Sequence, residues 1–156
     1  HDGFGCYSNM TRASKLIPVI EMAGRETDKA MQSLVQANNV LEQEKHQLND
    51  LLRYREEYLQ QFRQGDALQM SARKAIDLRS FLAQLDNAIR MQQRHVEQCF
   101  MQTQKQRQLW LEAKNKQRSI ESLKERYQKE DEQRQHKLEQ RLADEHTAML
   151  WARKHK

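Results

Sequence analysis

Two side chains with metal-binding chemistry, His95 and Cys99, stand four residues apart in the sequence. On a helix this spacing puts both on one face, where they could touch the same metal ion. A protein zinc site needs three or four protein ligands, and no further Cys or His is placed to complete this pair. We therefore interpret Cys99 as a thiol at the edge of a helix-packing surface beside a solvated His95. We predict no metal site and no cofactor.

Residues capable of acid, base or nucleophilic catalysis are not arranged for it either. Glu56 and Glu57 are adjacent, so on a helix their carboxylates point in different directions and cannot act as a catalytic pair. The sequence contains no glycine-rich phosphate loop and no nucleophile spaced with a base in a catalytic motif. We predict that the protein is not an enzyme.

The excess of positive charge comes from one stretch of the chain. Residues 102–129 hold eight Lys or Arg and three Asp or Glu, whereas the stretches on either side are balanced. A basic band can bind phosphates. Here, Glu112, Glu121 and Glu125 interrupt the band, and no nucleic-acid recognition motif accompanies it. We predict no nucleic-acid binding, and we interpret the band as a solvated face or a contact for an acidic protein surface.

The composition favours long helices over a globular core. Of the 156 residues, 37% are hydrophobic and 31% are charged, and there are only four Gly and one Pro. No apolar run reaches membrane-spanning length, and the N-terminus lacks the pattern of a secretory signal. Cys6 and Cys99 lie in such unlike surroundings that we expect no disulfide. These features predict a soluble, intracellular, all-α protein.

The first helix is predicted over residues 14–62. Residues 1–9, HDGFGCYSN, differ in composition from the rest, so we interpret them as a cloning remnant or as disordered upstream sequence, and we expect the native start at Met10. Ser14 is the expected N-cap. Pro18 then falls close to the first turn, where its missing N–H forfeits at most one hydrogen bond.

This helix carries a heptad pattern of the kind found in coiled coils. One predicted line of packing residues, the d positions, is Ile20, Thr27, Leu34, Leu41, Leu48, Arg55 and Phe62. The other predicted line, the a positions, is Ile17, Gly24, Met31, Asn38, Lys45, Leu52 and Leu59. Polar residues such as Asn38 and Lys45 inside a seam weaken packing while favouring one register.

A turn and a second helix follow. Gly65 and Asp66 supply turn chemistry within a loop predicted at residues 63–72, and Ser71 can cap a second helix predicted at residues 73–153. The apolar spacing of this helix resumes at Leu78, Leu82, Ile89 and Val96.

The two helices differ in length, which predicts the architecture. We expect a single all-α domain over residues 10–156, a long antiparallel two-helix coiled coil, or α-hairpin. The first helix is too short to cover all of the second, so the charged part beyond Leu123 is predicted to overhang without a partner helix. Its sparse apolar residues are Leu138, Leu142, Met149, Leu150 and Trp151.

Both helices carry a second apolar stripe about a quarter turn from the first. The stretch LLRYREEYLQQF, residues 51–62, holds more large apolar side chains than one side of a helix can accommodate. The second stripes are Gln47, Leu51, Tyr54 and Tyr58 on the first helix, and Phe81, Leu85, Ala88 and Gln92 on the second. They could be the edge of the coiled-coil core or an exposed surface that binds a partner.

Three blocks of the sequence resemble the flagellar export protein FliJ family. These are LLRYREEY before the predicted hairpin, FLAQLDNAI after it, and a tryptophan in RQLWLEAK. The opening KLIPVIEMAGRETDKA is also similar to the start of that family. The resemblance runs from about Met10 to the C-terminus, and the two aromatic blocks together are its most specific part.

The resemblance implies a function that the residue pattern alone does not. Members of the family are antiparallel coiled coils similar to the stalk subunit of rotary ATPases. They dock into the export ATPase ring, bind the cytoplasmic domain of the export gate protein FlhA and interact with export chaperones, coupling the ATPase to export. The resemblance therefore implies a cytoplasmic protein at the inner face of the cell membrane at the flagellar base, peripheral to the membrane through protein contacts only.

The resemblance also implies two sets of binding residues. The export-gate-binding set is the pair of second stripes, Gln47, Leu51, Tyr54, Tyr58, Phe81, Leu85, Ala88 and Gln92. The ATPase-binding set is Leu16, Ile17, Ile20, Arg25, Trp110 and Leu123.

Two other functions stay open at the level of sequence. One is the stalk protein of a virulence-type secretion apparatus, and the other is a generic scaffolding coiled coil. The aromatic blocks favour the flagellar family.

Overall fold

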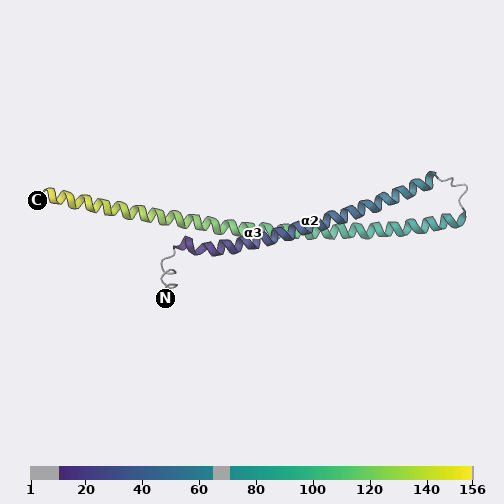
Figure 1. Cartoon of the computed structure of the whole chain (residues 1–156), viewed down its shortest axis with the longest axis horizontal. Helices are drawn as coiled ribbons and strands as arrows, with labels where there is room; N and C mark the ends of the chain where they lie inside the picture. Colours follow the sequence, from purple (N-terminus) through teal and green to yellow (C-terminus); the bar gives the residue numbers. More distant parts are fainter. Residues whose placement is uncertain (1–10, 65–70, 156) are drawn as a thin grey trace, which may run out of the picture. The chain divides into compact units, whose positions relative to one another are not determined.

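The structure, a computed structural model, describes residues 11–64 and 71–155, which form two helices, α2 (Arg12–Gln64) and α3 (Ala72–Lys154) (Figure 1). The two helices pack against each other and no strand occurs among the described residues, so the predicted all-α helical hairpin is confirmed. Residues 1–9 and the predicted turn residues Gly65 and Asp66 lie outside the described residues. The interpretation of residues 1–9 therefore stays a prediction.

No helix in the described ranges combines the length and the apolar character that a membrane span requires.

The start of α2 differs from the prediction. Thr11, not Ser14, is the N-cap: its Oγ1 accepts a hydrogen bond from the N–H of Ser14 at 3.1 Å, and its carbonyl accepts one from Lys15. Thr11 has a hydroxyl that can cap, as Ser14 does, but the sequence analysis named only Ser14. Because the helix begins at Arg12, Pro18 lies inside it and not in its first turn, and the Ser14 carbonyl loses its helical donor.

The start of α3 is capped by Ser71. Its hydroxyl oxygen accepts a hydrogen bond from the N–H of Lys74 at 3.2 Å, and its carbonyl accepts one from Ala75. From there α3 continues without any Gly or Pro to Lys154.

The chain divides into two compact units, each containing a part of α2 and a part of α3. We call residues 28–111 the hairpin unit, and residues 1–27 together with 112–156 the terminal unit. Each is described by itself.

In the hairpin unit the two helix segments run antiparallel. Glu44 of α2 meets Gln92 of α3, and Arg55, further along α2, meets Asp86, which is earlier on α3. The buried core between them is small because two helices enclose little volume. It consists of Leu34, Leu41, Leu85, Ile89 and Thr103.

One of the two predicted packing lines of α2 is wrong at several positions, although Asn38 and Leu59 of that line are half-buried. Leu34 and Leu41 of the predicted d line are buried, but Met31 and Leu52 of the predicted a line are 37% and 42% exposed. The second packing line lies on the other side of the d line. In the hairpin unit it is formed by Ala30, Ala37, Glu44, Leu51 and Tyr58, all half-buried.

Small side chains explain this difference. Alanine carries a weak apolar signal, so a pattern search favours the larger Met31 and Leu52. Of the two predicted polar seam residues, Asn38 is half-buried and Lys45 is not. Lys45 is exposed and pairs with Glu42 at 3.5 Å, while Glu44 faces α3 and accepts hydrogen bonds from the Gln92 amide at both its carboxylate, 2.7 Å, and its main-chain carbonyl, 3.0 Å.

In the terminal unit, Ala13 and Ala23 are the buried residues of α2, at 4% and 3% exposure. The first residue of the helix also contacts α3. The Arg12 guanidinium lies 3.0 Å from a Glu130 carboxylate oxygen and 3.6 Å from one of Asp131, and it covers the Tyr127 ring at 4.3 Å from the centroid. Contact with α2 therefore extends beyond Leu123, where the overhang was predicted to begin.

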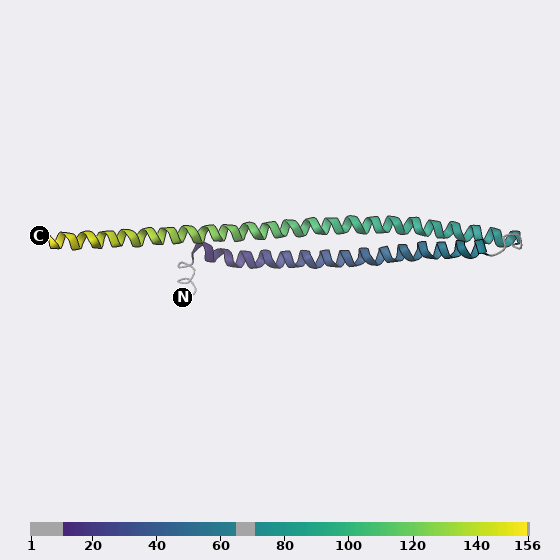
Figure 2. The same cartoon turned by 90° about the horizontal axis from the view of Figure 1, so that it is seen from above.

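The predicted overhang exists but starts later. Every residue from 132 to 155 is exposed. Figures 1 and 2 both show this last part of α3, drawn in yellow-green to yellow, with no other described helix beside it. Leu138, Leu142, Met149, Leu150 and Trp151 accordingly present their apolar surface to solvent.

Candidate functional site

Three aromatic side chains of the predicted gate-binding set form a cluster across the two helices of the hairpin unit. Tyr58 of α2 and Phe81 of α3 are closest, with ring centroids 4.5 Å apart. Tyr54 lies one helical turn from Tyr58, at 6.4 Å, and meets Phe81 edge-on at 6.1 Å and 72°. We call Tyr54, Tyr58 and Phe81 the aromatic cluster.

The cluster is packed on one side and open on the other. Tyr58 and Phe81 are half-buried, while Tyr54 is 50% exposed. Edge-to-face and tilted ring pairs of this kind restrain each other's rotation. The cluster therefore presents a large, restrained, partly apolar surface, which is the kind of surface that anchors protein partners.

The remaining residues of the predicted gate-binding set do not share one environment. Gln47 and Ala88 are exposed, Leu51 and Gln92 are half-buried, and Leu85 is only 7% exposed. Leu51 and Leu85 belong to the packing between the helices, so at these two positions the stripe is the edge of the coiled-coil core, the first of the two interpretations. The amide of Gln92 donates to Glu44 and is occupied within the chain.

Two hollows border the aromatic cluster. One is lined by Gln47, Asp50, Leu51 and Tyr54 on α2. The other lies between the helices, and its residues include Phe62 and Leu78, which sequence reasoning placed in the seam, together with Gln61, Lys74 and Asp77, which it did not single out. These three polar residues carry no periodic apolar signal, and only the packing of the two helices brings them beside the rings.

Ion pairs flank the cluster. Arg55 donates to Asp86 across the helices at 2.6 Å, and Arg53 pairs with Asp50 on α2. The side chains of Arg55 and Asp86 are 38% and 41% exposed, so solvent screens the pair and it contributes little stability. The ion pair links α2 to α3 one residue after Tyr54 in the sequence.

The predicted ATPase-binding residues fall into both units. In the terminal unit, Ile17 is 41% exposed and Arg25 is exposed, whereas Leu16, Ile20 and Leu123 are half-buried. Trp110 is half-buried and belongs to the hairpin unit. Val19 and Met22, which the sequence analysis did not single out, are 44% and 57% exposed on the same part of α2 as Ile17.

A family model for the flagellar FliJ protein matches residues 12–156. The chain belongs to the flagellar FliJ protein family. The match covers nearly the whole chain and confirms the resemblance seen in the sequence. Comparison with individual curated proteins gave no match, and neither did comparison with solved structures.

Family membership settles the function in general terms. This FliJ-family chain is a flagellar, export-related protein, and the family is a non-enzymatic component of flagellar protein export.

The pair His95 and Cys99 lies in the hairpin unit of the FliJ-family chain. The Cys99 sulfur is 4.0 Å from His95 Nε2, and that nitrogen is 3.6 Å from a Glu44 carboxylate oxygen. Within the described ranges, no group of three or more His, Cys, Asp or Glu side chains is placed to hold a metal ion. The half-buried Cys99 side chain instead lines a groove between the helices.

Part of the basic band is paired within the terminal unit. Lys116 lies 3.7 Å from Glu26 of α2, and Arg126 lies 3.9 Å from Glu130 on α3. Arg118 and Arg126 line a shallow hollow with Ser119 and Ser122. Acidic neighbours offset some of the positive charge that the sequence concentrates here.

Proposed function

We propose that this protein is a non-enzymatic adaptor of the flagellar export apparatus, which binds the cytoplasmic domain of the export gate protein FlhA through the aromatic cluster. Family membership supports the setting, and the aromatic cluster supports the mode of binding. In the same proposal the protein docks into the export ATPase ring through the start of α2, binds export chaperones, and so couples the ATPase to export from the cytoplasmic side of the membrane.

The observation that carries the gate-binding proposal is the geometry of Tyr54. Half of its surface is open to solvent while its ring packs against both Tyr58 and Phe81. A partner that covers Tyr54 gains apolar burial, and little side-chain entropy is lost because the ring is already restrained. Exposed Gln47 and Ala88 extend the same surface with groups that add no charge.

Exposed apolar residues at the start of α2 support the ATPase contact. Ile17, Val19 and Met22 each leave 41% or more of their surface open. Exposed apolar side chains grouped on one short segment are typical of a surface that a partner covers.

Calorimetric titration of the purified chain into the purified gate domain tests the gate-binding proposal. We expect the wild-type chain to bind and Tyr54→Ala to bind roughly thirtyfold more weakly, the loss typical of an interface anchor. Met91→Ala serves as the control, because Met91 is 62% exposed on α3 and lies outside the predicted set. Equal affinities for wild type and Tyr54→Ala would contradict the role of the cluster.

A further inference from the structure

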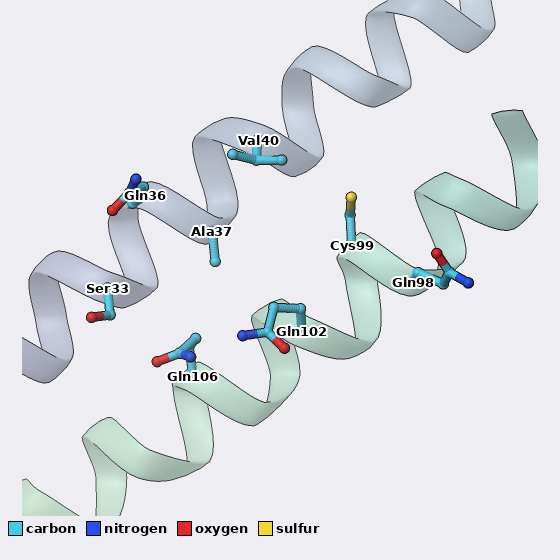
Figure 3. A pocket seen from close by; sticks show the side chains of 8 residues that line it. All are labelled: Ser33, Gln36, Ala37, Val40, Gln98, Cys99, Gln102 and Gln106. Atoms are coloured by element: carbon cyan, nitrogen blue, oxygen red, sulfur yellow. The ribbon is translucent and has the colours of Figure 1, made fainter.

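A groove lies between α2 and α3 in the hairpin unit, separate from the two hollows beside the aromatic cluster. Its volume is about 410 Å³. The apolar part is formed by Ala37 and Val40 of α2 and Cys99 of α3, and four glutamine side chains and Ser33 form the remainder. Figure 3 shows Ala37 pointing from α2 into the space between the helices and the Cys99 thiol pointing toward α2.

The hollow follows from the sizes of the residues in the seam. Ala37 and Cys99 both occupy packing positions and both are half-buried, but neither is long enough to fill the space between the backbones. Val40, at the edge, stays 40% exposed and leaves the groove open to solvent. The two helices therefore leave an apolar depression that a side chain of another molecule could fill.

The lining of the groove defines the chemistry of its occupant. None of its eight lining residues is charged, although 31% of the chain is charged. A phosphate or an anionic headgroup would find no cation among them. Glutamine amides both donate and accept hydrogen bonds, so they suit the main chain of a polypeptide whose apolar side chain enters the depression.

The groove lies on the same flank of the hairpin unit as the aromatic cluster. Val40, Gln47 and Tyr54 are spaced seven residues apart on α2, which places them along one side of the helix. Phe81 and Ala88 have the same spacing on α3. From Val40 to Tyr54 this line extends about 21 Å along α2, at 1.5 Å per residue, a length that one protein domain can cover.

We infer that the groove at Val40 and Cys99 is a second docking pocket for the partner of the aromatic cluster, the cytoplasmic domain of the export gate, and that it receives an aliphatic side chain of that domain. This inference rests on the proposed gate-binding function. It adds contacts that the predicted gate-binding set does not contain. It also gives a reason for the small side chains of Ala37 and Cys99 at this level of the seam.

A pair of valine substitutions tests the pocket. Val40→Glu places a charge in the apolar depression, whereas Val35→Glu makes the same change at a valine that is 49% exposed on a different side of α2. We expect Val40→Glu to weaken binding of the purified gate domain by roughly tenfold or more and Val35→Glu to leave it within about twofold. Equal effects of the two substitutions would overturn the inference, and circular dichroism melts show whether both variants fold.

A chemical measurement tests the pocket without altering it. In a Cys6→Ser variant, Cys99 is the only thiol of the chain, and its rate of alkylation by N-ethylmaleimide can be followed by mass spectrometry. We expect saturating gate domain to slow this reaction several-fold, because the bound domain covers the groove. An unchanged rate in the presence of bound gate domain would overturn the inference.

The two measurements separate this inference from the function on which it rests. If the gate domain binds the wild type and binds Tyr54→Ala weakly, but neither Val40→Glu nor alkylation responds, the proposed function stands and the second pocket is wrong. If the gate domain does not bind the wild type at all, the proposed function fails and the second pocket fails with it.

Discussion

Tyr54 and Leu85 show how differently two residues of one predicted stripe can be placed. Both are large, both follow the same helical spacing, and the resemblance assigned both to the export gate. Tyr54 is 50% exposed, whereas Leu85 is 7% exposed and packs between the helices. The spacing of a residue gives its direction around the helix, but only the position of the neighbouring helix decides whether that direction is buried.

Leu85→Ala is therefore predicted to destabilise the fold. Truncating a buried leucine removes apolar contacts and leaves a cavity, which costs roughly 2–5 kcal/mol. Tyr54→Ala removes a half-exposed ring and should cost no more than about 1.5 kcal/mol, the value of its ring contacts. Urea unfolding of both variants gives the comparison. If Leu85→Ala unfolds at the same urea concentration as the wild type, its place in the core is wrong.

Gly24 offers a prediction of the opposite sign. It lies inside α2, and a Cβ added there would meet only the amide nitrogen of Gln117, at 3.5 Å, an ordinary contact distance. Because Ala favours a helix interior over Gly, Gly24→Ala should stabilise the protein by roughly 0.5–1 kcal/mol. Thermal unfolding followed at 222 nm measures the gain. A lower melting temperature would mean that the two helices lie too close at Gly24 for a methyl group.

At the scale of elements, the sequence predicts two helices and their hairpin arrangement, but only half of the seam. Breaker residues are so rare that long helices are the natural prediction, and Leu34 and Leu41 mark the buried face correctly. The second packing line was not predicted from the sequence, because it contains Ala30, Ala37 and Glu44, which carry a weak apolar signal. The half-burial of Ala30 and Ala37 and the hydrogen bond to Glu44 depend on where α3 lies, which the periodicity of α2 does not contain.

The same limit applies to the candidate site. The sequence places Tyr54, Tyr58 and Phe81 on facing helices, and the structure brings their rings into contact. The sequence does not predict the groove at Val40 and Cys99, because the groove is the space that the side chains of Ala37 and Cys99 leave unfilled.

Truncation of α3 tests where the paired part of the terminal unit ends. Deleting residues 133–156 should change thermal unfolding little, because residues 133–155 are all exposed. Deleting residues 124–156 also removes the partners of Arg12, namely the Tyr127 ring and the half-buried Glu130 and Asp131, and should cost roughly 1–2 kcal/mol. Equal melting temperatures for the two truncated proteins would contradict the contacts of Arg12.

At the scale of the whole molecule, the proposed contacts are divided between the two units. The aromatic cluster belongs to the hairpin unit, and the exposed apolar residues around Ile17 belong to the terminal unit. Each unit has its own antiparallel helix contacts. A surface substitution in one unit therefore leaves the packing of the other unchanged, so the two proposed activities should be separable by mutation.

We predict that separation for Tyr54→Ala and Ile17→Glu. Tyr54→Ala should lose gate binding and keep its stimulation of the export ATPase, because the start of α2 is untouched. Ile17→Glu should do the reverse, since a charge on an exposed apolar contact costs desolvation in the complex but little in the free protein, where 41% of the side chain is already open. Phosphate release by the ATPase and calorimetric gate binding, measured on both variants, give the four values needed.

Val19→Glu tests whether the ATPase contacts one side of this segment or surrounds it. Val19 is 44% exposed, and two residues further along a helix it points about 200° away from Ile17. If the ATPase contacts the Ile17 side of α2, Val19→Glu keeps most of the stimulation that Ile17→Glu loses. Equal losses would mean that the ring surrounds the segment on all sides, as a helix inside a pore would require. Full stimulation by Ile17→Glu would place the ATPase contact elsewhere on the chain.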